Sequence, residues 1–350
     1  MPTGFKRIID NHAKSLDSSW QPTANFRYKS YCISNLRGGI GKSTLSFNVA
    51  FMMSRERPTL IADLCAQCNM TESMLRGSST PITIADALRP KLLGPAFGDL
   101  PEDISYNVGR HNENFKGGRG AFFIPGSGEL FAFPSSLYQQ LQQAVAQSNI
   151  SAVKNILLVL KAILDKEAED KKCELQIMDC SPFYAGATHL AWCAAEAIII
   201  PVRVDEHSVD SLELTLKMLS EKDSDFNIWK SRAGEISGPR IAAIVMTMVG
   251  ARSPEKGVKD RASQMYIERA YNICCHYNER FGNSIFDNDP ADAFVITDDF
   301  MSAGRISGAE GIPIPSLKVG KFHTVGGKRL QVNQSQIRYK RELEYLISVI

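Results

Sequence analysis

Short apolar segments alternate along the chain with longer stretches of mixed, helix-like polarity. Each apolar segment is about the length of one strand and contains few polar positions, which is typical of strands buried on both faces of a parallel sheet. The stretches 151–166 and 210–219 have the apolar spacing of helices. The pattern therefore predicts an α/β fold in which helices cover both faces of a mostly parallel sheet. The expected strands are 31–34, 59–62, 120–125, 175–179, 197–202 and 241–246.

The first of these strands runs directly into a glycine-rich turn. Residues 36–44 read Leu-Arg-Gly-Gly-Ile-Gly-Lys-Ser-Thr, and a helix-like segment follows. A strand, a glycine loop ending in Lys-Ser-Thr and a helix together form the pattern of a phosphate-binding loop. Gly38, Gly39 and Gly41 allow positive φ and a close approach, so that backbone N–H groups around Ile40 can point at phosphate oxygens. The N-terminus of the helix adds positive potential.

Three side chains of this loop have expected tasks. Lys42 supplies a full positive charge to the β and γ phosphates, and the Ser43 hydroxyl is the expected ligand of Mg²⁺. Thr44 can donate a hydrogen bond to an inner phosphate. The sequence therefore predicts that the chain binds a nucleoside triphosphate.

Two aspartates follow expected strands at the edge of the sheet where ligands bind in such folds. Asp63 ends the strand after the phosphate loop, and Asp179 precedes the segment Cys-Ser-Pro-Phe-Tyr-Ala-Gly at 180–186. An acidic residue in the position of Asp179 holds Mg²⁺ through its water shell, and the loop after it can sense the γ phosphate. The alternative is an aspartate that caps the next helix.

Length and composition agree with this interpretation. The chain has 350 residues, of which 44% are hydrophobic and 22% charged, and a net charge of +2 that argues against a general polyanion-binding surface. Its eight scattered cysteines suit reduced thiols, and we see neither a signal peptide nor a membrane span, which makes the cytosol the expected compartment. We expect an N-terminal extension at 1–27 and one domain at 28–350, with an irregular insertion at about 89–119.

Taken in order, the motifs resemble those of the ParA/MinD group of deviant Walker A P-loop ATPases, and most of all the ParA proteins that partition plasmids and chromosomes. The motifs lie at 37–44, 61–71 and 177–182 and at Thr247-Met248 with Arg252. Further similarity at 123–130, 200–202 and 303–314 extends the resemblance over about residues 30–315. It implies a three-layer P-loop NTPase fold.

The resemblance also implies a function. In this family ATP is sandwiched between the two subunits of a homodimer, the dimer binds DNA non-specifically or a membrane, and hydrolysis to ADP and phosphate, stimulated by a ParB-like or other adaptor protein, releases it. The output is the position of a cargo such as a plasmid or chromosome. ATP and Mg²⁺ are the implied cofactors. The implied catalytic residues are Arg37, Lys42, Asp63 and Asp179; Gly38 to Thr44 and Arg252 bind the nucleotide, and Ser43 and Asp179 hold the metal.

Two positions depart from the family pattern. Where the family carries a signature lysine that reaches the nucleotide of the partner subunit, this chain has Arg37, whose guanidinium can contact phosphate with two hydrogen bonds. The alternative is an arginine that supports the loop or pairs with a nearby carboxylate. The second departure is Cys65, which replaces the acidic residue that positions the attacking water. Since a thiol cannot act as that carboxylate, we expect hydrolysis to be slow, absent or dependent on another residue.

The remaining features concern surfaces. A cluster of basic residues near the C-terminus is our preferred DNA-binding surface. The final segment, 337–350, has apolar residues at helical spacing, and we favour a packed terminal helix over one that binds a membrane, as in the MinD branch. A second class of function is a nucleotide-stabilised scaffold or regulator that does not hydrolyse ATP. The basic cluster comprises Lys318, Lys321, Lys328, Arg329, Arg338, Lys340 and Arg341.

Overall fold

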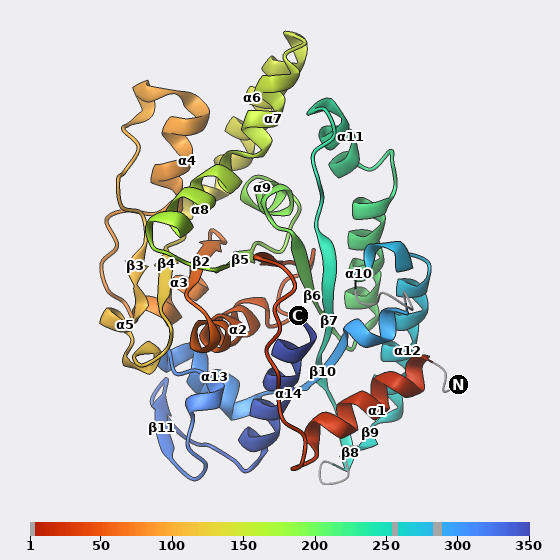
Figure 1. Cartoon of the computed structure of the whole chain (residues 1–350). Coiled ribbons are helices and arrows are strands. Elements are labelled where there is room, and N and C mark those ends of the chain that lie inside the picture. The colour runs from red at the N-terminus through yellow and green to blue at the C-terminus, as the bar shows by residue number, and fades with distance from the viewer. Residues whose placement is uncertain (1–3, 254–257, 283–288) are drawn as a thin grey trace.

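A computed structural model describes residues 4–253, 258–282 and 289–350 of the chain (Figure 1). At its centre lies a sheet whose strand order in the described part is β10-β7-β6-β1-β5-β2-β4-β3. Every neighbouring pair is parallel except β3 with β4. Helices cover both faces of this sheet. The expected α/β fold with a mostly parallel sheet between two helical layers is confirmed.

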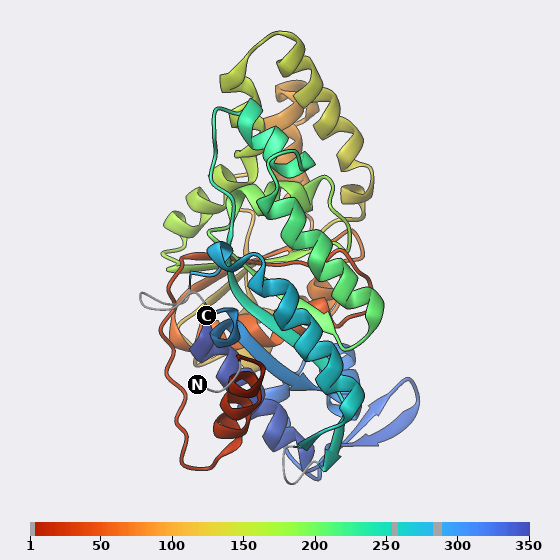
Figure 2. The ribbon, with the colours of Figure 1, turned by 90° about the vertical axis from the view of Figure 1, so that its right-hand side faces the viewer.

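The elements follow one another in the alternating order that a parallel sheet requires. A small antiparallel hairpin, β11–β12, extends away from the main body (Figure 2). The bounds of the helices are α1 Gly4–Leu16, α2 Lys42–Glu56, α3 Asn69–Leu75, α4 Ile84–Leu93, α5 Val108–His111, α6 Phe133–Ala146, α7 Ile150–Leu157, α8 Val159–Asp170, α9 Ala187–Ala194, α10 Glu206–Ser220, α11 Asp225–Arg232, α12 Arg261–Cys275, α13 Met301–Glu310 and α14 Ser335–Val349. The bounds of the strands are β1 Ser30–Ile33, β2 Thr59–Leu64, β3 Tyr106–Asn107, β4 Ala121–Ile124, β5 Leu175–Cys180, β6 Ala197–Arg203, β7 Arg240–Val249, β8 Ala251–Ser253, β9 Val258–Lys259, β10 Phe294–Asp298, β11 Phe322–Val325 and β12 Lys328–Gln331.

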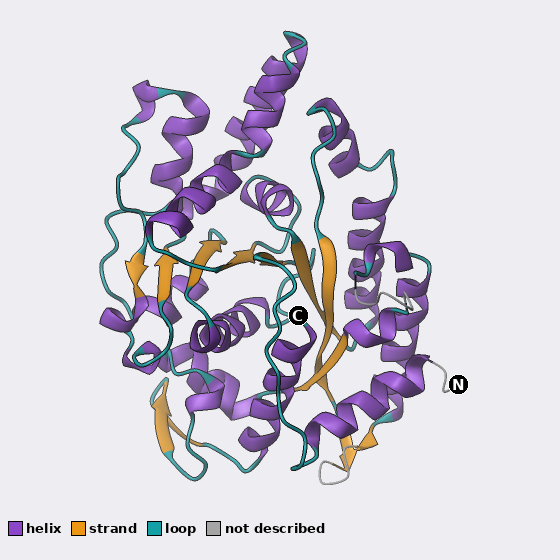
Figure 3. Cartoon of the chain, viewed as in Figure 1, coloured by secondary structure: helices purple, strands orange, loops and turns teal. Residues whose placement is uncertain are grey.

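The central strands are buried on both faces, which explains why they appear in the sequence as continuous apolar runs. Along β1, Tyr31 and Ile33 pack into the core beneath α2 and α14, whereas Cys32 packs into the core on the opposite face. Figure 3 shows the strands enclosed between helices. Because side chains alternate between the two faces of a strand, each strand contributes to two separate hydrophobic cores.

The six expected strands are all present, and several other elements differ from expectation. The helix expected at 151–166 is broken at Leu158 into α7 and α8. The strand β10 at one sheet edge and the short β3 at the other were not expected from the sequence pattern. The segment 89–119, expected to be irregular, includes the end of α4 together with β3 and α5, and its Val108 and Phe115 are buried in the core.

The sheet order determines where the site forms. β1 lies between β5 and β6, and β2 is the next strand beyond β5. Asp179 on β5 is therefore level with Ile33 on β1 and with Asp63 on β2. The loop after β1 and both aspartates meet at the carboxyl edge of the sheet, where ligands bind in open α/β folds.

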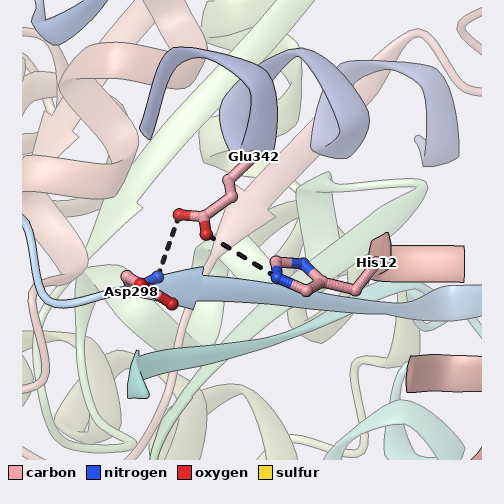
Figure 4. A group of neighbouring side chains, drawn as sticks. All are labelled: His12, Asp298 and Glu342. Atoms are coloured by element: carbon pink, nitrogen blue, oxygen red, sulfur yellow. Dashed lines mark hydrogen bonds and ion pairs between the residues drawn. The ribbon is translucent and has the colours of Figure 1, made fainter. Parts of the chain in front are cut away.

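The two ends of the chain pack together. Glu342 of α14 accepts a hydrogen bond from the backbone N–H of Asp298 at 2.9 Å, and its other oxygen lies 3.8 Å from His12 Nε2 of α1 (Figure 4). Arg338 pairs with Asp298 at 2.6 Å. The apolar face of α14, including Leu343, is buried, so the terminal helix is packed as expected.

Within the described residues, none of the helices has the length and apolar character needed to cross a bilayer.

Candidate nucleotide-binding site

The phosphate loop takes its shape from two glycines. Gly39 and Gly41 have φ values of 73° and 84°, in the left-handed region that side chains disfavour. Gly38 lies outside this region, so the left-handed conformation that glycine allows is used at two of the three positions. A Cβ at Gly38 would come only within 4.0 Å of Pro182, at ordinary contact distance. The turn then enters α2 at Lys42, with the N-terminus of this helix facing the cavity described next.

A cavity of about 340 Å³ opens in front of the loop. One wall is the loop itself and the first turn of α2. The opposite wall comes from α3 and the residues before it, and from Ser307 and Gly308 of α13. The cavity places backbone N–H groups, hydroxyls and one ammonium together, which is the chemistry that binds phosphate. Its other lining residues are Gly38, Gly39, Gly41, Lys42, Ser43, Thr44, Phe47, Cys65, Gln67, Asn69, Glu72, Ser73, Cys180 and Pro182.

Lys42 is largely buried within this cavity. Its ammonium donates a hydrogen bond to the backbone carbonyl of Arg37, at the start of the same loop. Burial lowers the pKa of Lys42, and the nearby Asp179 carboxylate opposes that shift. The ammonium thus points along the loop, where it can exchange the Arg37 carbonyl for a phosphate oxygen.

Asp179 fits the metal role assigned to it. It is fully buried, and its Oδ1 accepts a hydrogen bond from Ser46 Oγ at 2.7 Å. Its Oδ2 makes no hydrogen bond within the described structure. Burial raises the pKa of Asp179, whereas the hydroxyls of Ser46 and Ser43 and the charge of Lys42 lower it. A buried carboxylate oxygen without a partner, next to the Ser43 hydroxyl, is a donor set that suits Mg²⁺.

Asp63 has a different environment from Asp179. It is fully buried, and its two oxygens accept hydrogen bonds from the N–H of Cys65 at 3.0 Å and from the N–H and hydroxyl of Thr71 at 3.0 and 2.8 Å. Burial and then the neighbouring Asp179 raise the pKa of Asp63 to about 7. Asp63 does not line the cavity. Its contacts fix the shape of the segment between β2 and α3.

Cys65 lies in the cavity wall as a buried thiol. It is 5% exposed, and burial raises its pKa. Burial also raises the pKa of Cys68 to about 11. All eight cysteines are free, and those in the described structure take no part in a group of three metal ligands. The thiol of Cys65 therefore provides no carboxylate chemistry at this position.

Arg37 makes an ion pair within its own chain. Its Nη1 lies 3.1 Å from Asp205 Oδ1, with both side chains about one-third exposed. Asp205 also accepts a hydrogen bond from the N–H of Ser208, at the start of α10, and lies 3.4 Å from Arg203 Nε. In the single subunit, Arg37 thus pairs with a carboxylate rather than facing the phosphate cavity.

A second cavity of about 390 Å³ adjoins the first, and Gly41 and Thr44 line both. Thr247 at its wall donates a hydrogen bond to the carbonyl of Ile40 at 3.2 Å, which ties the loop to β7. Arg252 lies on β8, and its side chain is outside the described part of the structure. The opposite wall of this second cavity contains no residue that a sequence motif names, although the similarity at 303–314 covers part of it. That wall comprises Thr297, Asp298, Asp299, Phe300, Met301, Gly304 and Arg305.

The C-terminal basic cluster divides into two groups. Lys318, Lys321, Lys328 and Arg329 lie exposed on and beside the β11–β12 hairpin, where Arg329 stacks 3.9 Å from the centre of the Phe322 ring. The second group, on α14, is paired: Arg338 with Asp298, and Lys340 and Arg341 with Glu344 at 3.7 and 3.8 Å. The seven residues therefore do not form one uniform cationic surface.

Comparisons with known proteins agree with this geometry. The model of a family described as an AAA domain matches residues 28–228, more than half of the chain. No individual curated protein matches significantly.

Solved structures share the fold at low sequence identity. The ATP complex of a McdA variant from Cyanothece aligns with a TM-score of 0.57 and 17% identity over 83% of this chain and 90% of that chain. A putative plasmid partition protein from Borrelia burgdorferi B31, bound to AMPPNP, aligns with a TM-score of 0.56 and 17% identity over 93% of this chain and 100% of that chain. Together with the family match and the phosphate loop, these findings show that the chain belongs to the ParA/MinD-type P-loop ATPases of the AAA-domain family.

Proposed function

We propose that the chain is an ATP-dependent dimerising switch of the ParA type, which binds DNA non-specifically and positions a plasmid, chromosome or other cargo. The observation that carries this proposal is the phosphate cavity, in which Lys42, Ser43 and the loop N–H groups converge beside the buried Asp179. Two structural relatives are described as complexes with ATP and AMPPNP, which supports the choice of nucleotide.

The two adjoining cavities suggest how the nucleotide lies. The β and γ phosphates occupy the first cavity against Lys42, and Thr44 at the junction contacts an inner phosphate. The nucleoside then extends into the second cavity, beside Thr247 and the start of α13. Ser43 and Asp179 would hold Mg²⁺, which when bound neutralises phosphate charge.

DNA binding is assigned to the β11–β12 hairpin and not to α14. The four cations of the hairpin group are exposed, and no acidic residue occurs between Gly311 and Arg341; the nearest carboxylate in the sequence, Glu310, pairs with His323 of β11 at 2.8 Å. Contacts between lysine or arginine and DNA phosphates are independent of base sequence and weaken with salt. A ParB-like or other adaptor is the proposed protein partner, and the proposed location is the cytoplasm, on the nucleoid when DNA is bound.

Subunit mass tests this function directly. We expect the protein to change from monomer to dimer on addition of ATP and Mg²⁺, and the dimer to retain a DNA duplex that the ADP-bound protein releases. Light scattering coupled to size exclusion would measure the first change, and fluorescence anisotropy of labelled DNA the second. A protein that remains monomeric with saturating ATP would contradict the proposal.

Cys65 favours one second candidate, a nucleotide-stabilised scaffold that does not hydrolyse ATP. The cavity has a thiol where the family has its water-positioning acid. In that case ATP would lock the dimer, and its release would require a partner or nucleotide exchange. Phosphate release measured with and without DNA separates the two candidates.

A further inference from the structure

The cavity needs a group that can orient the water for ATP hydrolysis, and this inference rests on the proposed function. Cys65 cannot serve. The oxygens of Asp63 are occupied by the backbone and hydroxyl groups of residues 65 and 71. Asp179 is buried against Ser46 and is assigned to the metal. The amide oxygen of Gln67 accepts a hydrogen bond from Asn69 at 3.4 Å, and an amide cannot take up a proton.

Glu72 on α3 is the one acidic side chain that lines the phosphate cavity in the described part of the chain. It is exposed, and the described structure gives its carboxylate neither a hydrogen bond nor an ion pair. An unpaired carboxylate in a cavity built for a triphosphate repels the ligand. Glu72 lies in the first turn of α3, where its charge also suits the helix N-terminus, but within the cavity it is the only carboxylate of the described residues that can reach a bound phosphate or its water.

The residues on either side of Glu72 are held firmly. Thr71 is bound through its N–H and hydroxyl to the buried Asp63. Ser73 donates to the carbonyls of Asn69 at 3.2 Å and of Gly308, in α13, at 3.4 Å. The backbone of Glu72 is therefore fixed against the cavity wall while its side chain is free to turn towards bound phosphate. This arrangement gives Asp63 a positioning role, since it anchors the turn that presents Glu72.

We propose that Glu72 takes over the task of the missing acid at position 65 and orients the water that attacks the γ phosphate of ATP. The water oxygen forms a bond to the γ phosphorus while the bond from that phosphorus to the bridging oxygen breaks, and the electron pair of that bond leaves with ADP. The water proton passes to the Glu72 carboxylate and then to solvent. The products are ADP, inorganic phosphate and one proton.

The test compares four variants by ATP turnover and by ATP affinity. Glu72→Gln keeps the size of the side chain but removes the carboxylate. Cys65→Asp restores the acid of the family pattern, and the double variant combines both changes. Glu268→Gln, on the exposed surface of α12, is the matched control. Turnover is measured by phosphate release with DNA present, and affinity by titration with a fluorescent ATP analogue.

We expect Glu72→Gln to lower kcat by about 100-fold, because general base catalysis contributes factors of this order. Its ATP affinity should stay unchanged or rise. Cys65→Asp should make Glu72 dispensable, so that the double variant recovers turnover to within about tenfold of the wild type. Glu268→Gln should behave as the wild type.

Three results would overturn the assignment. The first is wild-type turnover in Glu72→Gln with tighter ATP binding, which would leave Glu72 as a merely repulsive charge. The second is a double variant as slow as Glu72→Gln alone. The third is a wild-type protein without turnover even with DNA. None of these affects the proposed ATP-dependent dimer, which is measured separately by subunit mass.

Discussion

Two buried carboxylates, on the neighbouring strands β2 and β5, lie level with each other at the edge of the sheet that carries the phosphate loop. Asp63 and Asp179 are paired across β2 and β5, and neither is exposed. Burial raises the pKa of both, and the charge of Asp179 further disfavours ionisation of Asp63. The folded protein therefore holds a proton at this pair that the unfolded chain releases at lower pH.

This pair makes stability depend on pH. For Asp63 the folded pKa of about 7 lies above the ordinary value of 3.8, so stability is present at low pH and is lost as pH rises through about 7. Asp179→Asn removes one of the two buried charges. The wild type should lose stability as pH rises from about 5 to about 8, and the variant should lose less. Across this range the free energy of unfolding of the variant should therefore rise by about 1 to 3 kcal/mol relative to that of the wild type. Urea unfolding without nucleotide measures this difference.

The control for this prediction is Asp223→Asn, at an exposed position. Its stability should follow the wild type at each pH. Parallel pH profiles for Asp179→Asn and the wild type would show that the buried pair does not titrate in this range.

At the level of single residues, the sequence predicts the site residues that belong to one short motif. Lys42, Ser43 and Thr44 lie within a few positions of one another and share one loop, so their meeting in the cavity follows from the sequence. The pairing of Arg37 with Asp205 depends on the neighbouring strands β1 and β6, and no local pattern indicates it. The cavity position of Glu72 depends on how Asp63 holds the turn before it.

At the level of elements, the hairpin and α14 differ in their basic side chains: those of the hairpin are exposed, whereas those of α14 form ion pairs. Charge runs in the sequence do not show which lysines and arginines find a carboxylate in the fold, and the three basic residues of α14 do so. The same limit applies to β10, whose short apolar run becomes a strand by pairing with β7. The break between α7 and α8 at Leu158 lies within a continuous helical pattern and has no local signal such as glycine or proline.

The role of the β11–β12 hairpin in DNA binding can be tested by substitution. Replacing Lys328 and Arg329 together by alanine removes two exposed cations and should weaken binding to duplex DNA. The logarithm of the DNA-binding constant falls linearly with the logarithm of the salt concentration, and each phosphate contact contributes about 0.9 to the steepness of that line. The double variant should therefore give a line that is less steep by about two units. Lys340→Ala, whose ammonium lies beside Glu344, is the matched control and should change the slope little. Equal effects of the two changes in a salt titration would argue against the hairpin as the DNA surface.

At the level of the whole molecule, the ion pair of Arg37 with Asp205 competes with any role of Arg37 across a dimer. Asp205→Asn removes the charge and keeps an oxygen that can accept from the N–H of Ser208 at the start of α10. We expect this variant to dimerise at lower ATP concentration, and Arg37→Ala to bind ATP but dimerise poorly. Subunit mass against ATP concentration tests both expectations. Unchanged dimerisation in Arg37→Ala would restrict this arginine to its own subunit.

The central claim is that the phosphate loop of this chain binds ATP through the Lys42 ammonium. Calorimetric titration of the wild type with ATP and Mg²⁺, beside Lys42→Ala and the exposed control Lys166→Ala, tests it most directly. Loss of a charged hydrogen-bond donor should weaken binding by about 10- to 100-fold in Lys42→Ala, while Lys166→Ala binds as the wild type does. Absence of ATP binding by the wild type, or equal affinity in all three proteins, would contradict the account.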